Sequence, residues 1–274
     1  MSHLSLDVNY FKKIDEPKKA YWLGFICADG YINVNNSKLS INVKDKEILE
    51  KFKFDIKSRH KLSERIIFDK RTNKNYQQYT LQITNQIFVQ NIVSHGITHQ
   101  KTDIANFPNI DENLYSYFIA GLFDGDGSIS LDSKNKRVRC NLISTKEILI
   151  FIQNILYKNF DIKFKKFYKV TKNKNNVYKI FFYGDNAISF LNYIYQGNYN
   201  IFLSRKYNKY INNRYNKTSK KRNQPISVYD ENKNKIYSFK TIKDAISKLN
   251  VRWGGIRRSF LTKKKYKGYY WEYN

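Results

Sequence analysis

Two acidic residues at the end of an apolar segment have the chemistry to bind a metal ion. The segment YFIAGLFDGDGSI, residues 117–129, brings Asp124 and Asp126 to the C-terminal end of a predicted helix. Carboxylates there oppose the helix dipole, whose negative end lies at the C-terminus. A divalent cation would offset this placement. The simpler interpretation is a turn that only ends the helix, and the rest of the sequence has to decide between the two.

The same unit occurs twice in the chain. YWLGFICADGYI at 21–32 matches the segment at 117–129 when Asp29 is laid on Asp126, an offset of 97 residues. Further matches follow in order at nearly the same offset: KEIL at 46–49 and 146–149, and YTLQITNQIFVQNI at 79–92 with YKIFFYGDNAISFLNYI at 178–194. Three ordered matches indicate an internal duplication.

Each copy has the pattern of a helix, a hairpin, a second helix, a second hairpin and a closing helix. Period-2 alternation of apolar and polar residues predicts strands with one buried face. The residues expected to face inward are Ile32, Val34, Leu39, Ile41 and Val43 in copy one, and Ile129, Leu131, Val138, Cys140 and Leu142 in copy two. The sequence therefore predicts an α+β fold with two pseudo-symmetric αββαββα repeats and antiparallel, saddle-like sheets.

The composition favours a nucleic-acid partner. Fifty Lys and Arg residues stand against 23 Asp and Glu, a formal charge of +27, and a polyanion would relieve the resulting repulsion. No apolar run reaches the length of a membrane span, so we expect no membrane insertion. The two cysteines, Cys27 and Cys140, lie in apolar segments, which predicts an intracellular, reducing compartment.

The two acidic segments resemble the LAGLIDADG motif, as WLGFICADG at 22–30 and IAGLFDGDG at 119–127. Two such motifs about 100 residues apart, each followed by the same pattern, resemble a single-chain LAGLIDADG homing endonuclease. Small residues four apart also let two helices approach closely. These are Gly24 and Ala28 in copy one, and Gly121 and Gly125 in copy two. Packing of the two motif helices would bring Asp29 and Asp126 together.

The resemblance implies metal-assisted hydrolysis of one phosphodiester in each DNA strand. Asp29 and Asp126 would bind Mg²⁺, for which Mn²⁺ could substitute, and the carbonyl groups of Ala28 and Gly125 would complete the metal site. It also implies basic residues near the scissile phosphates, Lys101 and Lys206, with Arg205 as the rival of Lys206. The positions that orient the attacking water would be Asp45 and Thr145. The sixth motif position is structural in the family, and it differs between the copies, with Cys27 in one and Asp124 in the other.

The resemblance implies that a monomer binds one long, asymmetric site in double-stranded DNA. The outward-facing strand residues differ between the copies, so the two half-sites would differ as well. The candidate DNA contacts are Asn33, Asn42 and Lys44 in copy one, and Arg137, Arg139, Asn141 and Lys179 in copy two.

The tail is predicted to be a second DNA-binding module. From Arg205 to Asn274 there are 20 Lys and Arg residues against four acids. The tail resembles a nuclease-associated modular domain with a helix-turn-helix, which would put Arg257 and Arg258 on or beside the recognition helix. The alternative is a small basic tail that only adds affinity. The predicted boundaries are 1–104 and 105–210 for the repeats, 211–224 for an extended basic linker, and 225–274 for the module.

Two other functions fit the same fold. One is a maturase that assists splicing of intron RNA, and the other is a DNA-binding regulator that has lost cleavage. Loss of either motif acid would favour these alternatives, and both Asp29 and Asp126 are present. The sequence therefore favours the endonuclease, either intron-encoded or free-standing.

Overall fold

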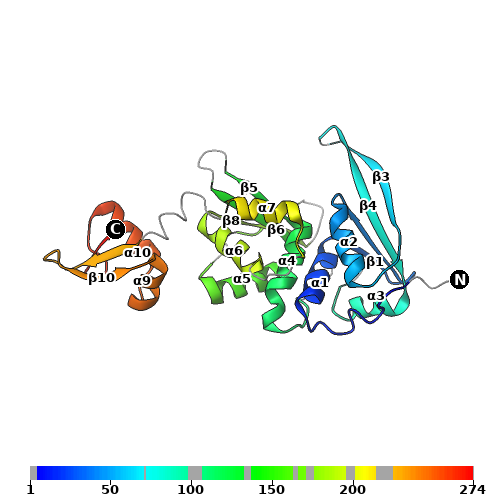
Figure 1. Ribbon diagram of the computed structural model, residues 1–274, viewed down its shortest axis with the longest axis horizontal. Coiled ribbons are helices and arrows are strands. Elements are labelled where there is room, and N and C mark those ends of the chain that lie inside the picture. Colours follow the sequence, from blue (N-terminus) through cyan, green and yellow to red (C-terminus); the bar gives the residue numbers. More distant parts are fainter. Residues whose placement is uncertain are drawn as a thin grey trace. The chain divides into compact units, whose positions relative to one another are not determined.

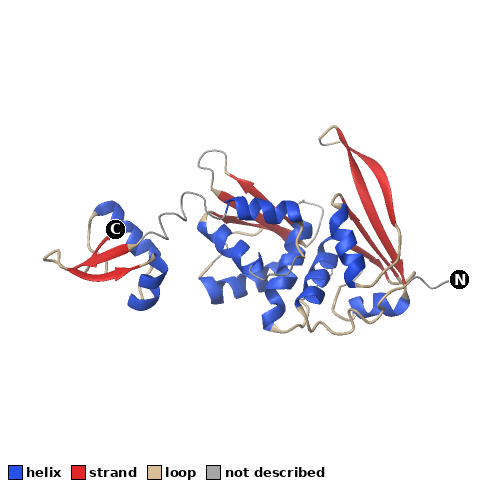
Figure 2. Cartoon of the chain, in the orientation of Figure 1, coloured by secondary structure: helices blue, strands red, loops and turns tan. Residues whose placement is uncertain are grey.

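Two units with separate hydrophobic cores make up the chain. The computed structural model divides into residues 1–211 and residues 212–274, and we describe each unit by itself. Figure 1 labels the elements and Figure 2 colours them by type. Among the described residues, no helix is long and apolar enough to cross a membrane. The structure describes residues 5–70, 72–97, 107–132, 137–162, 166–170, 176–195, 201–213 and 225–273.

The first repeat has the predicted αββαββα order. Pro17 begins its first helix, where the N–H that proline lacks would have had no partner in the helix. Asn85 caps its last helix, because the Asn85 side chain accepts a hydrogen bond of 2.9 Å from the Phe88 N–H. The elements are α1 (Pro17–Asp29), β1 (Gly30–Asn33), β2 (Lys38–Val43), α2 (Lys46–Asp55), β3 (Leu62–Asp69), β4 (Lys74–Thr84) and α3 (Gln86–Val93).

The second repeat has the same order, preceded by a short 3₁₀ helix and followed by one further helix. The elements are η1 (Glu112–Leu114), α4 (Tyr115–Asp126), β5 (Gly127–Leu131), β6 (Val138–Thr145), α5 (Lys146–Phe160), β7 (Tyr168–Lys169), β8 (Val177–Tyr183), α6 (Asp185–Tyr195) and α7 (Ser204–Asn213). Asp45 and Thr145 take the N-cap positions of α2 and α5.

Each repeat contains one four-stranded antiparallel sheet, and the two strand orders correspond. They are β1-β2-β4-β3 and β5-β6-β8-β7. The pairings also correspond: Gly30 pairs with Ile41 and Ile41 with Leu81, as Gly127 pairs with Leu142 and Leu142 with Ile180. Apolar side chains on one face of each sheet are buried in the common core with the helices. This arrangement confirms the predicted α+β fold with two pseudo-symmetric repeats.

The two motif helices, α1 and α4, touch through their glycines. A Cβ atom added to Gly24 would lie 2.0 Å from the carbonyl oxygen of Phe118, and one added to Gly121 would lie 1.9 Å from that of Tyr21. Figure 1 shows α1 and α4 side by side. The contacts are reciprocal, so the small residues predicted from the sequence allow the two backbones to meet directly.

In its described residues, 225–273, the second unit has a three-stranded sheet and two helices. Its strand order is β10-β9-β11, and Trp271 and Ile256 lie in its core. Thr241 and Asp244 form a capping box at the start of the first helix. The elements are β9 (Ile226–Tyr229), β10 (Lys235–Phe239), α9 (Ile242–Leu249), α10 (Trp253–Thr262) and β11 (Tyr270–Tyr273).

Three local expectations differ from the structure. Val34 is 48% exposed because it lies in the turn after β1, and Leu131 is 44% exposed because it is the last residue of β5. Residues 211–213, expected to begin the extended linker, instead belong to helix α7, because Tyr207, Tyr210 and Ile211 pack against the core. The predicted linker at 211–224 thus starts inside α7, and its residues 214–224 lie outside the described residues.

Candidate active site

The C-terminal ends of α1 and α4 adjoin each other. A Cβ atom added to Gly125 would lie 2.3 Å from the Ala28 Cβ and 3.2 Å from the Asp29 Oδ2. Asp126 is the next residue after Gly125, and both motif acids are half-buried. The glycine contacts therefore bring the last turns of the two helices together, each with a carboxylate at its end.

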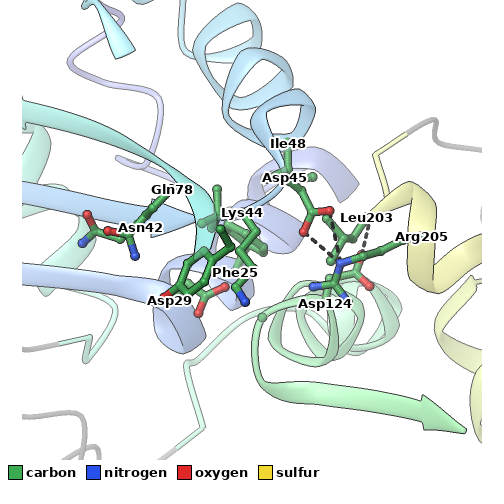
Figure 3. Close-up of a pocket in the computed structure, with 13 residues that line it drawn as sticks. Phe25, Asp29, Asn42, Lys44, Asp45, Ile48, Gln78, Asp124, Leu203 and Arg205 are labelled. Atoms are coloured by element: carbon green, nitrogen blue, oxygen red, sulfur yellow. Dashed lines mark hydrogen bonds and ion pairs between the residues drawn. The ribbon is translucent and has the colours of Figure 1, made fainter. Parts of the chain in front are cut away.

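A polar pocket of about 250 Å³ opens beside Asp29. Asp29 and Asp45 contribute carboxylates, whereas Lys44 and Arg205 contribute positive charge (Figure 3). The other residues that line it are Phe25, Asn42, Val43, Ile48, Tyr76, Gln78, Asp124, Gly125 and Leu203. Carboxylate, amide and backbone oxygens are the ligands that Mg²⁺ prefers, and the cations suit a phosphate.

Helix α7 closes one side of this pocket, although it follows the second repeat in the chain. Arg205 Nε donates to both carboxylate oxygens of Asp45, at 3.1 and 2.9 Å (Figure 3). The Ser204 N–H donates to Glu47 at 3.2 Å, and the hydrogen bonds from Ser204 lower the pKa of Glu47. The start of α7 is therefore held against the start of α2, which belongs to the first repeat.

Asp124 is the centre of a buried hydrogen-bond network. Its carboxylate accepts from the hydroxyls of Tyr21 and Tyr195, at 2.7 and 2.6 Å, and from the Leu203 N–H at 2.9 Å. Burial raises the pKa of Asp124, while the nearby Lys206 charge and these hydrogen bonds oppose the shift. Asp124 thus ties α1, α6 and the start of α7 to α4, and its oxygens are occupied by protein donors.

Lys206 is buried at the end of α4. Its ammonium donates to the carbonyl oxygens of Phe123 and Asp124, at 2.8 and 2.6 Å, and to that of Gly125 at 3.3 Å. The residue is 3% exposed, and burial lowers the pKa of Lys206 to about 8, against the opposing pull of Asp124 and the two motif acids. Lys206 therefore satisfies the last carbonyls of α4 and puts positive charge near the motif acids.

The structure brings some of the predicted site residues together and places the others on separate elements. Asp29, Asn42, Lys44 and Gly125 line one pocket, and Ala28 packs beside it. The remaining predicted residues lie elsewhere. Asn33 is on β1, Arg139 and Asn141 on β6, Lys179 on β8, and Arg137 directly before β6. Thr145 is buried at the start of α5, and Arg258 is exposed on α10. Lys101 lies outside the described residues, as does the side chain of Arg257.

Sequence reasoning missed the pocket residues on β4. Tyr76 and Gln78 lie on the outer face of the first sheet, and the Lys44 ammonium lies 3.5 Å from the centroid of the Tyr76 ring. Arg65 Nε donates to Gln78 at 2.8 Å on the same face. The alternation of apolar and polar residues along 74–84 could have identified these two residues. Leu81 and Ile83 point inward, so every second residue from Gln82 back to Tyr76 points outward.

Comparison with protein families gives one match that spans both repeats. The family model described as LAGLIDADG-like domain matches residues 16–95 and residues 113–195. No curated protein sequence matches the chain.

Solved structures give matches of low identity. The homing endonuclease I-WcaI bound to its DNA recognition sequence is 18% identical, with a TM-score of 0.47 and coverage of 74% of this chain and 90% of that chain. Full-length DUF199/WhiA from Thermatoga maritima is 18% identical with a TM-score of 0.43, and the match covers 69% of this chain but only 61% of that chain. I-DmoI in complex with DNA and Ca is 15% identical with a TM-score of 0.40, covering 70% of this chain and 92% of that chain.

Proposed function

Because the chain belongs to the LAGLIDADG-like domain family, we propose that it is a site-specific homing endonuclease that makes double-strand breaks in DNA. The observation that carries the proposal is the pair of carboxylates, Asp29 and Asp126, at the adjoining ends of α1 and α4. A formal charge of +27 supports a polyanionic substrate. A pair of acids placed only to end two helices would not explain the polar, cation-lined pocket beside Asp29.

The motif acids would hold divalent metal ions, Mg²⁺ or Mn²⁺. The donors fit such ions, because Asp29 and Asp126 offer carboxylates and Ala28 offers a backbone carbonyl, all hard oxygen ligands. The Gly125 carbonyl accepts from Lys206 at 3.3 Å and would bind an ion through its second lone pair. A bound ion would lower the pKa of the attacking water and stabilise the charge on the phosphate.

The surrounding residues would supply orientation and charge. Arg205 lines the pocket and could stabilise charge on the phosphate that is attacked beside Asp29. Asp45, which Arg205 binds, faces the same pocket and could accept a hydrogen bond from the attacking water. Lys206 would act indirectly. It binds the carbonyl oxygens of Phe123 and Asp124, which lie just before Asp126 in α4. In this assignment Arg205, rather than Lys206, is the basic residue nearer the phosphate.

The outer faces of the two sheets would bind the DNA duplex. Each repeat offers a different set of polar and basic side chains, so one monomer would bind one long, asymmetric site. The unit at 212–274 would add a second contact, since Arg258 is exposed on α10 and α10 follows α9 after a connection of three residues. We propose that this unit is the nuclease-associated module.

The test is cleavage of a cognate duplex. The target would first be selected from a randomised duplex library by binding to the protein, and then be compared with the intronless and intron-bearing forms of the insertion site. We expect Mg²⁺-dependent double-strand cleavage of the intronless form and none of the intron-bearing form. Tight binding without cleavage in Mg²⁺ or Mn²⁺ would overturn the endonuclease and favour a regulator, and preferential binding of the intron RNA would favour a maturase.

A further inference from the structure

The outer face of the second sheet carries a row of aromatic side chains. Phe181 and Tyr183 alternate with the buried Ile180 and Phe182 along β8, so both point away from the core. Tyr168 on β7 pairs with Lys179 and lies on the same face. Tyr168 is 44% exposed and Tyr183 is 56% exposed. We call Tyr168, Phe181 and Tyr183 the aromatic row.

The rings of the aromatic row are in mutual contact. The centroids of Tyr168 and Phe181 are 5.4 Å apart in an edge-to-face arrangement. Those of Phe181 and Tyr183 are 6.0 Å apart, with an angle of 27° between the ring planes. The three residues therefore form one continuous aromatic strip across two strands of the sheet.

Cations flank the aromatic row on the same face. The Arg139 guanidinium lies 4.4 Å from the centroid of Phe181 and 5.3 Å from that of Tyr183. The Lys179 ammonium lies 5.4 Å from the centroid of Phe181, and the Lys166 ammonium 5.5 Å from that of Tyr168. Aromatic rings with Arg and Lys beside them can bind bases through the rings and phosphates through the cations.

The first sheet has different residues at the matching positions. Leu81 on β4 corresponds to Ile180 on β8. Leu81 pairs with Ile41, which pairs with Gly30 at the end of the first motif. In the same way Ile180 pairs with Leu142, which pairs with Gly127 at the end of the second motif. One and three residues further along, the first sheet has Gln82 and Thr84 where the second has Phe181 and Tyr183. Both Gln82 and Thr84 are exposed. The aromatic side chains at these two positions are therefore not required by the sheet itself.

Only unpaired bases offer their faces to such a row. In a duplex the base faces are stacked on one another, and a protein meets base edges, sugars and phosphates. In single-stranded nucleic acid the faces are free to stack on aromatic side chains. We infer that the aromatic row is a binding site for unpaired bases of single-stranded nucleic acid, beyond the duplex cleavage proposed above. Arg139, Lys179 and Lys166 bind the phosphates of the same strand.

The test replaces the aromatic row with the residues of the first sheet. The variant is Phe181→Gln with Tyr183→Thr, and the matched control is Gln82→Ala with Thr84→Ala. Neither changes the charge of the protein. The probes are labelled oligouridine RNA and oligothymidine DNA of about 12 nucleotides, an abasic strand of the same length, and a duplex of the same length. Fluorescence anisotropy measures the dissociation constants, and circular dichroism checks the fold.

We expect the native protein to bind both single strands more tightly than the abasic strand, which has the same phosphates. The variant should lose about tenfold or more in affinity for the single strands, a larger loss than for the duplex that the same face binds, and the control should retain its affinity for the single strands. Tighter binding of RNA than of DNA would identify RNA as the preferred source of the bases.

Equal losses for single strands and duplex would overturn the inference, as would native binding of the abasic strand at full affinity. If the double variant fails to fold, Tyr183→Thr alone serves as the test, because that side chain is more than half exposed and its removal leaves the core intact. Duplex cleavage, measured separately in Mg²⁺, tests the endonuclease and does not depend on this result.

Discussion

The two motif helices are alike at their mutual contact and differ in the side chains that pack their C-terminal ends. Gly24 and Gly121 make reciprocal backbone contacts, and each helix ends in an aspartate. Two residues before that aspartate, however, α1 has the buried Cys27 and α4 has the buried Asp124. The duplication has thus kept the packing and the terminal carboxylate in both copies, while the support of the helix end has diverged.

The divergence makes one half of the site depend on the other. Asp124 fixes Leu203 at the start of α7, and α7 then carries Arg205 into the pocket beside Asp29. A residue of the second repeat therefore helps to build the site of the first. Changes at shared positions should affect the repeats equally, whereas changes at position 27 or 124 should not.

The largest expected effect is at the shared glycines. Gly24→Val and Gly121→Val should each lower the free energy of unfolding by about 4 kcal/mol or more, because the new Cβ would overlap backbone atoms of the opposite helix. Urea unfolding of both variants measures the loss. Gly254→Ala is the control, since a Cβ there meets nothing within 4 Å, and it should be neutral or stabilise by about 1 kcal/mol. Unequal losses at the two glycines would break the symmetry claimed for the interface.

The next effect separates positions 124 and 27. Asp124→Asn should lower the free energy of unfolding by about 3 kcal/mol, because it removes the buried anion that faces Lys206. Cys27→Ala should lower it by only about 1 kcal/mol, as the loss of a small buried side chain. Chemical denaturation of the two variants checks this. Equal losses at the two positions would mean that the Asp124 network contributes nothing beyond packing.

Removal of residues 214–274 should act on both repeats alike. We expect affinity for the target to fall about tenfold to 100-fold, with a smaller dependence on salt, because fewer phosphate counterions are released. Cleavage of both strands should remain measurable at high protein concentration, since the pocket and both motif acids lie before residue 212. Binding titrations at several salt concentrations give the slope. A folded but completely inactive fragment would place part of the active site in the second unit.

The smallest effect concerns Arg205. Arg205→Ala should slow cleavage about tenfold, equivalent to roughly 1.4 kcal/mol, mainly on the strand cut beside Asp29. Lys209→Ala on the same helix removes the same charge outside the pocket and should leave the rate unchanged. End-labelling of each strand separates the two cuts. Equal slowing of both strands would contradict the assignment of Arg205 to one half-site.

Local patterns in the sequence predict much of this fold. Alternation of apolar residues identifies the strands, because the period of two is a local property of each strand. The duplication adds long-range information, since matched small residues on two helices predict that α1 and α4 meet.

The support of the site could not be predicted in this way. Asp124 binds Tyr195 and Leu203, which are 71 and 79 residues away along the chain. No local pattern marks such partners, and its match in the first repeat is a cysteine. Lys206 lies in the basic run SRKYNKY, which is typical of a solvent-exposed or phosphate-binding segment, and only the folded chain reveals its three carbonyl partners.

The central claim is that Asp29 and Asp126 are the paired metal ligands of a DNA endonuclease. Asp29→Asn and Asp126→Asn keep the shape of each side chain but remove its charge. Cleavage of a plasmid that carries the target and gel-shift binding of a target duplex should be measured on the same preparations, with circular dichroism as the folding control. We predict that each variant loses double-strand cleavage by about 1,000-fold or more while binding the target as well or more tightly. Full cleavage activity in both variants would contradict the account and leave the two acids as helix ends.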